Sequence, residues 1–263
     1  MGLTIVAGPQ GVRAAQQPLL SEPFTGTTVS NPAWTPASNA GAASRSSMPL
    51  PCLTATVNTT ATPVAGCATR SPALPPGGDP SGGGVLRLTN NVDYQATILV
   101  DHESRPFDVG LIADFDVYMY AKGMTNAPAD GISFFLADGS VPITSPGAYG
   151  GGLGYAPIGG IKGLPGGYMA VGVDELGNFE QQLTDGSGCT HPPSALLPAP
   201  RVGLRGPGSG TTGYCLVASS GALPGALDSP AATTRASAAK RHVHIVIDEP
   251  CSLPVDGPRR GAM

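Results

Sequence analysis

The sequence predicts an all-β fold, and three observations lead to a β-sandwich. Charged residues make up only 12% of the chain, about half of their usual share in soluble domains, which excludes coiled coils and helical bundles. Short apolar or alternating segments recur between turns rich in the 38 glycines and 28 prolines. No segment of a dozen residues has helical periodicity. Strands at fairly regular spacing, punctuated by Gly and Pro, are typical of a sandwich.

The expected strands can be justified in order along the chain. Residues 110–120 alternate apolar and polar side chains, which predicts one buried face and places Asp114 and Asp116 together on the opposite face. Residues 131–137 are continuously apolar, as suits a central strand. The complete set of expected strands is 85–88, 94–100, 110–120, 131–137, 168–173, 201–205 and 242–248.

We expect three segments: a weakly patterned stretch over 1–20, one β-sandwich domain over 21–250, and a Pro-rich basic tail over 251–263. The domain begins with a loop-rich part that extends to residue 84.

Charge and hydropathy restrict the partners and the compartment. The net charge is −4 and there are three lysines, so nucleic acid is not an expected partner. No run approaches the roughly 18 apolar residues of a membrane span. The apolar stretch from Leu3 to Gly8 is too short for a clear signal peptide. A surface rich in Ser, Thr, Gly and Pro favours a secreted, cell-surface or virion protein.

The five cysteines have neither CxxC nor zinc-finger spacing. Cys52 and Cys67 bracket one polar loop, and Cys189 and Cys215 bracket another. In an oxidising compartment we expect these two local disulfides, with Cys251 left over. The alternative is five reduced thiols in a cytosolic protein.

Three motifs occur in a suggestive order. Pro128–Ala137 carries Ala-Asp-Gly at the start of an apolar strand, residues 150–154 read GGGLG, and Ala170–Phe179 is a strand that runs into Asp-Glu-Leu-Gly-Asn. Together with Arg205–Tyr214, they resemble the bacterial branch of the L-type, or legume-type, lectin domain. The resemblance covers about Phe24 to Asp248. It implies a concanavalin-like sandwich (a jelly roll) of two antiparallel sheets that binds sugar through loops at one edge.

The resemblance also assigns the carbohydrate-binding residues. Asp130 is expected to accept hydrogen bonds from two sugar hydroxyls after a cis peptide at Ala129–Asp130, and Asn178 to donate an amide hydrogen bond. Gly151 and Gly152 are expected to leave the sugar close access to the backbone.

A calcium ion is the implied cofactor. Asp174, the Leu176 carbonyl and Asn178 form an all-oxygen ligand set that suits Ca²⁺. Plant members of the family carry a Glu where this chain has Gly172, which argues against a second, transition-metal site. Asp185 and His191 are loosely placed candidates for further ligands.

Relatives continue with further strands beyond the one matched by 242–248, whereas here the Pro-rich tail follows. We therefore expect a sheet that is incomplete at the C-terminus, with an exposed edge that could pair with a protein partner or a second copy.

Other chemistries are less well supported. His242 and His244 lie two apart on an expected strand and could bind zinc, but an exposed strand face is the simpler interpretation. A glycoside hydrolase needs two carboxylates at matched spacing; Asp114 and Asp116 have the spacing without the expected glutamate. We therefore expect a carbohydrate-binding protein that is not an enzyme. The alternative is an adhesive or structural module that contacts proteins.

Overall fold

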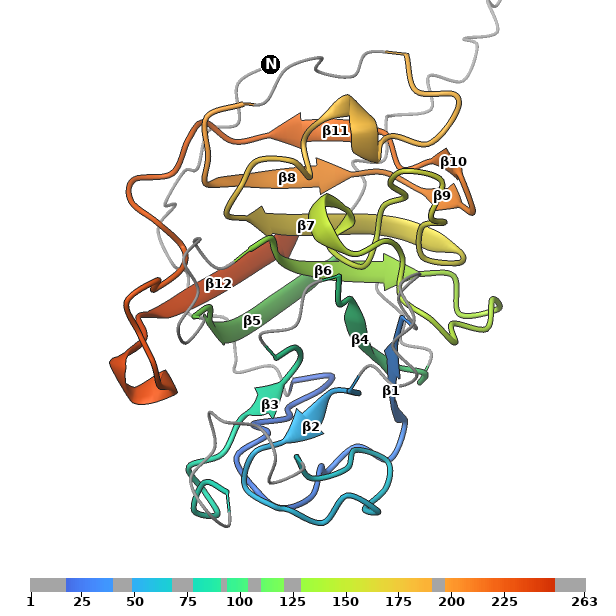
Figure 1. The fold of residues 1–263 in the computed structure, drawn as a ribbon. Helices are drawn as coiled ribbons and strands as arrows, with labels where there is room; N and C mark the ends of the chain where they lie inside the picture. Colours follow the sequence, from blue (N-terminus) through green and yellow to red (C-terminus); the bar gives the residue numbers. More distant parts are fainter. Residues whose placement is uncertain are drawn as a thin grey trace, which may run out of the picture.

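A computed structural model of the chain describes residues 18–39, 49–67, 78–90, 94–103, 110–120, 129–190 and 197–248. These residues form antiparallel β-structure with three very short 3₁₀ helices, which confirms the all-β prediction (Figure 1). The strands are β1 (Trp34–Ser38), β2 (Cys52–Leu53), β3 (Leu86–Arg87), β4 (Thr97–Asp101), β5 (Leu111–Tyr118), β6 (Gly131–Ala137), β7 (Gly167–Asp174), β8 (Arg201–Arg205), β9 (Gly208–Ser209), β10 (Thr212–Gly213), β11 (Leu216–Ser219) and β12 (Lys240–Ile247). The helices are η1 (Gly150–Gly152), η2 (Gln182–Thr184) and η3 (Arg235–Ser237).

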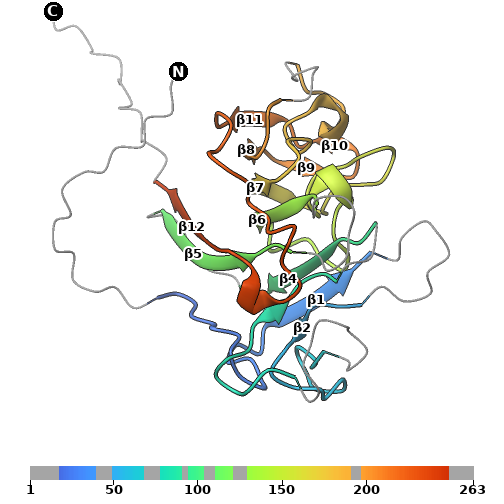
Figure 2. The ribbon, with the colours of Figure 1, turned by 60° about the vertical axis from the view of Figure 1, so that its left-hand side comes forward.

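The largest sheet has six strands. β7 pairs with β6 on one side and with β8 and β9 on the other, β11 continues the sheet beyond β8, and β10 pairs with β9. β1 pairs with β4, β2 with β3, and β5 with β12. Figure 2 shows the β5–β12 pair on the opposite side of the large sheet from η1.

Alternation along the strands gives the large sheet two different faces. Ala170 and Gly172 of β7 lie opposite Arg205 and Gly203 of β8, so these four residues share one face. Loop segments cover that face: Ala170 belongs to a buried core with Tyr155, Phe179 and Tyr214, to which β1 and β4 contribute Ala37, Ile98 and Val100. We call this the loop-covered face. The reverse face carries half-buried apolar side chains such as Phe134, Val171 and Leu204.

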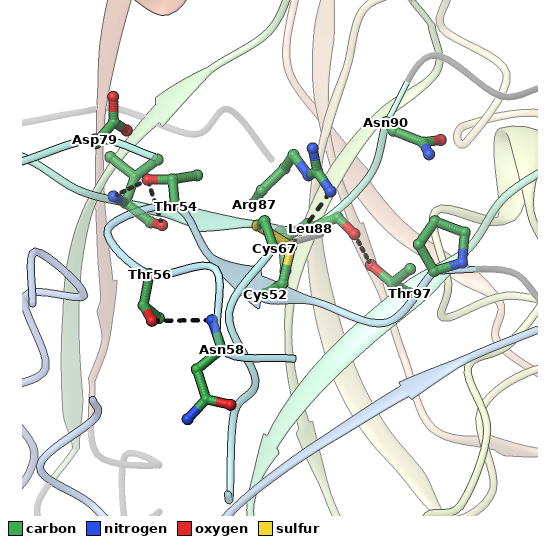
Figure 3. The surroundings of a disulfide bond; sticks show 12 residues. Cys52, Thr54, Thr56, Asn58, Cys67, Asp79, Arg87, Leu88, Asn90 and Thr97 are labelled. Carbon is green, nitrogen blue, oxygen red and sulfur yellow. Dashed lines mark hydrogen bonds between the residues drawn. A yellow bond between two sulfur atoms is a disulfide. The ribbon is translucent and has the colours of Figure 1, made fainter. Parts of the chain in front are cut away.

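Both expected disulfides are present. Cys52 and Cys67 are bonded with a Cα–Cα distance of 5.0 Å, and Cys189 and Cys215 with 5.3 Å. Figure 3 shows the first of these beside Arg87, which donates a hydrogen bond of 3.4 Å to Cys52 Sγ. Cys251 lies outside the described residues.

The strand β12 is paired through eight consecutive positions with β5, and with no other strand among the described residues. The side chains on its outer face, His242 and His244, are exposed, as expected from their spacing. In the described part of the chain β11 is an edge strand of the large sheet. None of the described helices is long and apolar enough to cross a membrane.

Candidate functional site

Asp130 and Asn178 meet at one end of the large sheet. Asp130 directly precedes β6 and Asn178 follows β7 by four residues, and the first residue of β6 pairs with the last residue of β7. The Asn178 side-chain amide Nδ2 donates a hydrogen bond of 2.7 Å to Asp130 Oδ1. Both side chains are half-buried. The structure thus brings together two predicted site residues that are 48 positions apart.

Asp130 is held by its backbone and is electrostatically perturbed. The Ala129–Asp130 peptide is cis, and the Asp130 carbonyl accepts the Glu175 N–H at 2.8 Å. Burial raises the pKa of the Asp130 carboxyl above its ordinary value, the Asn178 hydrogen bond lowers it, and the nearby charge of Asp174 raises it further. The carboxyl therefore becomes ionised at a higher pH than an exposed aspartate does.

The predicted glycine turn lies against this pair as the helix η1. A Cβ at Gly151 would sit 2.8 Å from Asn178 Cγ, and one at Gly152 would sit 2.9 Å from Ala148 Cβ. A Cβ at Gly150 would approach Asp130 Oδ2 at 3.6 Å. Gly151 and Gly152 are themselves buried, so their main structural role is to allow close packing of η1. Gly150, which the sequence analysis did not assign to the site, is the residue of η1 that borders Asp130 Oδ2.

Asp174 organises the loop that presents Asn178. Its carboxylate is fully buried and accepts the Leu176 N–H at 2.8 Å on Oδ1 and the Phe179 N–H at 2.6 Å on Oδ2. These two bonds close the loop around Gly177, which has a φ of 75°, a conformation that glycine adopts without steric cost.

A second buried carboxyl lies under the same loop. Glu180 is fully buried, and among the described residues neither of its side-chain oxygens has a hydrogen-bond partner. Burial and the adjacent charge of Asp174 raise the pKa of Glu180 to about 7. Asp174 and Glu180 therefore form an acidic pair that disfavours two simultaneous charges.

Arg205 is a buried cation that the sequence analysis missed. It is fully buried on β8, and it donates to the carbonyls of Phe179 (2.7 Å), Gln181 (2.9 Å) and Tyr214, to the Thr184 hydroxyl, and to Asp185 (2.5 Å). Its guanidinium also lies 5.1 Å from the centre of the Phe179 ring. Arg205 thus ties residues 179–185 to the sheet. Asp185, a loosely placed candidate for a metal ligand, instead pairs with this cation, and His191 lies outside the described residues.

The oxygen atoms of Asn178, Asp174 and Leu176 can be compared with the ligand set that was expected for calcium. Asn178 Oδ1 is buried and has no hydrogen-bond partner among the described residues. A bound cation would satisfy this orphaned acceptor, which is an oxygen donor of the kind that Ca²⁺ prefers. Both oxygens of Asp174, the other side-chain carboxylate of the expected set, already accept backbone N–H groups. The Leu176 backbone contacts Asp174 through its N–H. Among the described residues no group of three or more His, Cys, Asp and Glu side chains is arranged to hold a metal.

The two histidine side chains on β12 pair with the two aspartate side chains on β5. His244 Nδ1 lies 2.6 Å from Asp114 Oδ1, His242 Nδ1 lies 3.0 Å from Asp116 Oδ1, and Lys240 donates to Asp116 at 2.9 Å. The contacts with these partners lower the pKa values of both aspartates. The four His and Asp side chains are exposed and paired across the strands.

Comparison with protein-family models, with curated proteins and with solved structures finds no match to this chain.

Proposed function

We propose that this protein is a non-catalytic, carbohydrate-binding, lectin-like domain with a concanavalin-like sandwich fold. The observation that carries the proposal is the Asp130–Asn178 pair, an acceptor and a donor 2.7 Å apart at the same end of the sheet. Asp130 Oδ2 has no hydrogen bond to another described residue, and the Asn178 amide keeps a second N–H.

This pair suits two neighbouring hydroxyl groups of a sugar. An ionised carboxylate accepts strong hydrogen bonds from hydroxyl donors, and the amide N–H donates to a hydroxyl oxygen. Gly150 leaves the space next to Asp130 Oδ2 clear of a side chain, because a Cβ there would already lie 3.6 Å from that oxygen. The partner class is therefore a glycan.

Calcium is a second part of the proposal. It rests on the orphaned Asn178 Oδ1 and on the buried carboxylate of Asp174, which holds the loop that carries Asn178. When bound, the ion would fix Asn178 and add positive charge near the sugar hydroxyls. Arg205 anchors the following segment independently, so removal of calcium is expected to weaken sugar binding without unfolding the loop.

The proposal also covers location and the absence of catalysis. Two disulfides suit an oxidising, extracellular or surface-exposed setting. Asp114 and Asp116, the carboxylates with hydrolase-like spacing, are engaged by His242, His244 and Lys240. This pairing favours a structural role over acid–base work on a glycosidic bond.

The test is a glycan-array screen of the wild-type protein, with added Ca²⁺ and with EDTA, followed by titration of the best glycan. Asp130→Asn should weaken binding tenfold or more, because hydrogen bonds to a charged group are worth about 1.5–3 kcal/mol each. Asp138→Asn is the matched control, since Asp138 is an exposed carboxylate at the other end of β6 that holds Ser140. Equal binding by wild type and Asp130→Asn would refute the site.

A second candidate function has one observation in its favour. A groove of about 300 Å³ lies between Tyr168, Leu204, Pro207 and Val217, next to the edge strand β11. An adhesive or structural module would use such an apolar surface to contact a protein or a second copy. Partner binding that survives Asp130→Ala but is lost in Val217→Asp would favour this alternative.

A further inference from the structure

Two tyrosines form an aromatic surface next to the Asp130–Asn178 pair. Tyr149 directly precedes Gly150, the residue that borders Asp130 Oδ2. The ring of Tyr94 packs edge-to-face on the ring of Tyr149, with centroids 5.3 Å apart and an interplanar angle of 70°. Tyr94 is 60% exposed. Successive Cα atoms are about 3.8 Å apart. Tyr149 is therefore one residue away from the glycine that borders Asp130 Oδ2.

Tyr94 is held in an unusual backbone conformation. Its φ is +61°, which is uncommon for a bulky residue and persists only where the surroundings enforce it. Asn39 provides that enforcement: its side chain donates to the Tyr94 carbonyl at 3.0 Å and accepts the Ala96 N–H at 2.6 Å. These two bonds fix the backbone that carries the Tyr94 ring, which is mostly exposed and therefore contributes little to the buried core.

Tyr149 is anchored equally firmly. Its neighbour Ala148 is fully buried, donates its N–H to the Ala156 carbonyl at 3.1 Å, and accepts the Gly154 N–H at 2.9 Å. The two rings are therefore presented by two rigid backbones from distant parts of the chain. A preformed aromatic surface of this kind binds with little loss of side-chain freedom.

We propose that Tyr94 and Tyr149 form a second sugar subsite, so that the ligand is an oligosaccharide of at least two pyranose rings rather than a single sugar. This inference rests on the proposed function and specifies its ligand class. One ring is held through its hydroxyls by Asp130 and Asn178. The C–H groups on the face of the next ring lie on Tyr94, because the electron-rich face of an aromatic ring attracts their partial positive charge.

The experiment compares glucose, cellobiose and cellotriose, together with the corresponding galactose and mannose series, by calorimetric titration. Wild type is expected to bind the di- or trisaccharide of one series at least tenfold more tightly than its monosaccharide. Tyr94→Ala should remove that difference, a loss of about 1.4 kcal/mol, while leaving monosaccharide affinity within twofold of wild type. Tyr94→Phe should retain it, since the ring is kept. Ile112→Ala, which shortens an equally exposed apolar side chain on β5, is the control.

Saturation-transfer NMR on the wild type provides a measurement that does not depend on a variant folding. Irradiation of the tyrosine ring protons should label the second sugar ring more strongly than the first. Sugar binding that depends on Asp130 but shows equal affinity for mono- and oligosaccharides would overturn the subsite alone. So would unchanged oligosaccharide affinity in Tyr94→Ala. Absence of binding to every saccharide in the panel and on the array would overturn the proposed function and the subsite together.

Discussion

The two faces of the sheet formed by β6, β7 and β8 differ in what covers them. On the loop-covered face, Ala170 of β7 is fully buried among Tyr155, Phe179 and Tyr214, and Arg205 of β8 is fully buried beneath residues 179–185. On the reverse face, Phe134, Val171 and Leu204 remain half-buried. Neighbouring residues on the same strands thus have very different surroundings. Burial is greater on the face whose loops also build the candidate site, so these loops are part of the core.

The largest expected difference between the faces lies at two adjacent residues of β8. Arg205→Met leaves Asp185 and several buried carbonyls without a donor, and breaking a buried ion pair costs about 3–5 kcal/mol. Leu204→Ala, one position earlier on the reverse face, should cost only about 1–2 kcal/mol, because a half-buried side chain loses less than the 2–5 kcal/mol of a core leucine. Urea unfolding of both variants measures the difference. Equal losses would mean that the reverse face is as well packed as the loop-covered face.

The disulfide between Cys189 and Cys215 should contribute somewhat less. It ties the segment after η2 to the start of β11 across a separation of 26 residues, and a loop of that size corresponds to about 3 kcal/mol on the chain-entropy model. Cys189→Ser combined with Cys215→Ser should lower the free energy of unfolding by that amount. The control is Cys52→Ser with Cys67→Ser, which opens a loop outside the large sheet. Only the first pair of substitutions should also speed amide-proton exchange at Gly186, whose N–H donates to the Gly213 carbonyl, and at Gly213, whose N–H donates to the Ser187 carbonyl.

Glu180, on the loop-covered face, is expected to make the free energy of unfolding depend on pH. Its pKa is raised from about 4.5 in the unfolded chain to about 7 by burial and by Asp174, so the folded state holds the proton more tightly. The contribution of Glu180 to the free energy of unfolding is therefore greatest below pH 4.5. It falls by roughly 2–3 kcal/mol as the pH rises toward 7. Glu180→Gln should flatten that fall in EDTA-treated protein. An unchanged pH profile in this variant would contradict the buried acidic pair.

The smallest effect is expected at the candidate site itself. Asp130 has a raised pKa, so its ionised form is slightly unfavourable in the folded protein at neutral pH. Asp130→Asn should therefore change the free energy of unfolding by less than about 1 kcal/mol, toward greater stability, and the gain should vanish in acid where the carboxyl is protonated. Thermal melts at pH 7 and at pH 3.5 measure this. A large loss of stability would assign Asp130 to the structure rather than to binding.

Much of the large sheet could be predicted from the local sequence pattern, because short apolar runs bounded by Gly and Pro clearly indicate strands. Residues 131–137 and 201–205 form strands with the expected bounds. β1 was missed because Pro36 interrupts it, and β9 and β10 because their glycine-rich segment resembles a loop. β2 and β11 have only two and four residues, which is too short for a clear pattern. In the candidate site, the order of the motifs predicted that Asp130 and Asn178 would lie together, as they do. Arg205 and Glu180 were missed because charged side chains normally indicate surface, and their burial depends on partners distant in the sequence.

Two glycines that pair between β7 and β8 limit which substitutions this sequence can accept. Gly172 and Gly203 face each other across the two strands. A Cβ at the first would collide with the Phe179 ring, and one at the second with the Glu180 carboxyl. Each glycine is therefore tied to the size of one loop side chain. Gly172→Ala should be harmful alone and largely rescued by Phe179→Leu, a coupling that a double-mutant cycle would measure. Accepted substitutions at these positions should accordingly arise in pairs, so that the loop and the two strands beneath it evolve as one unit.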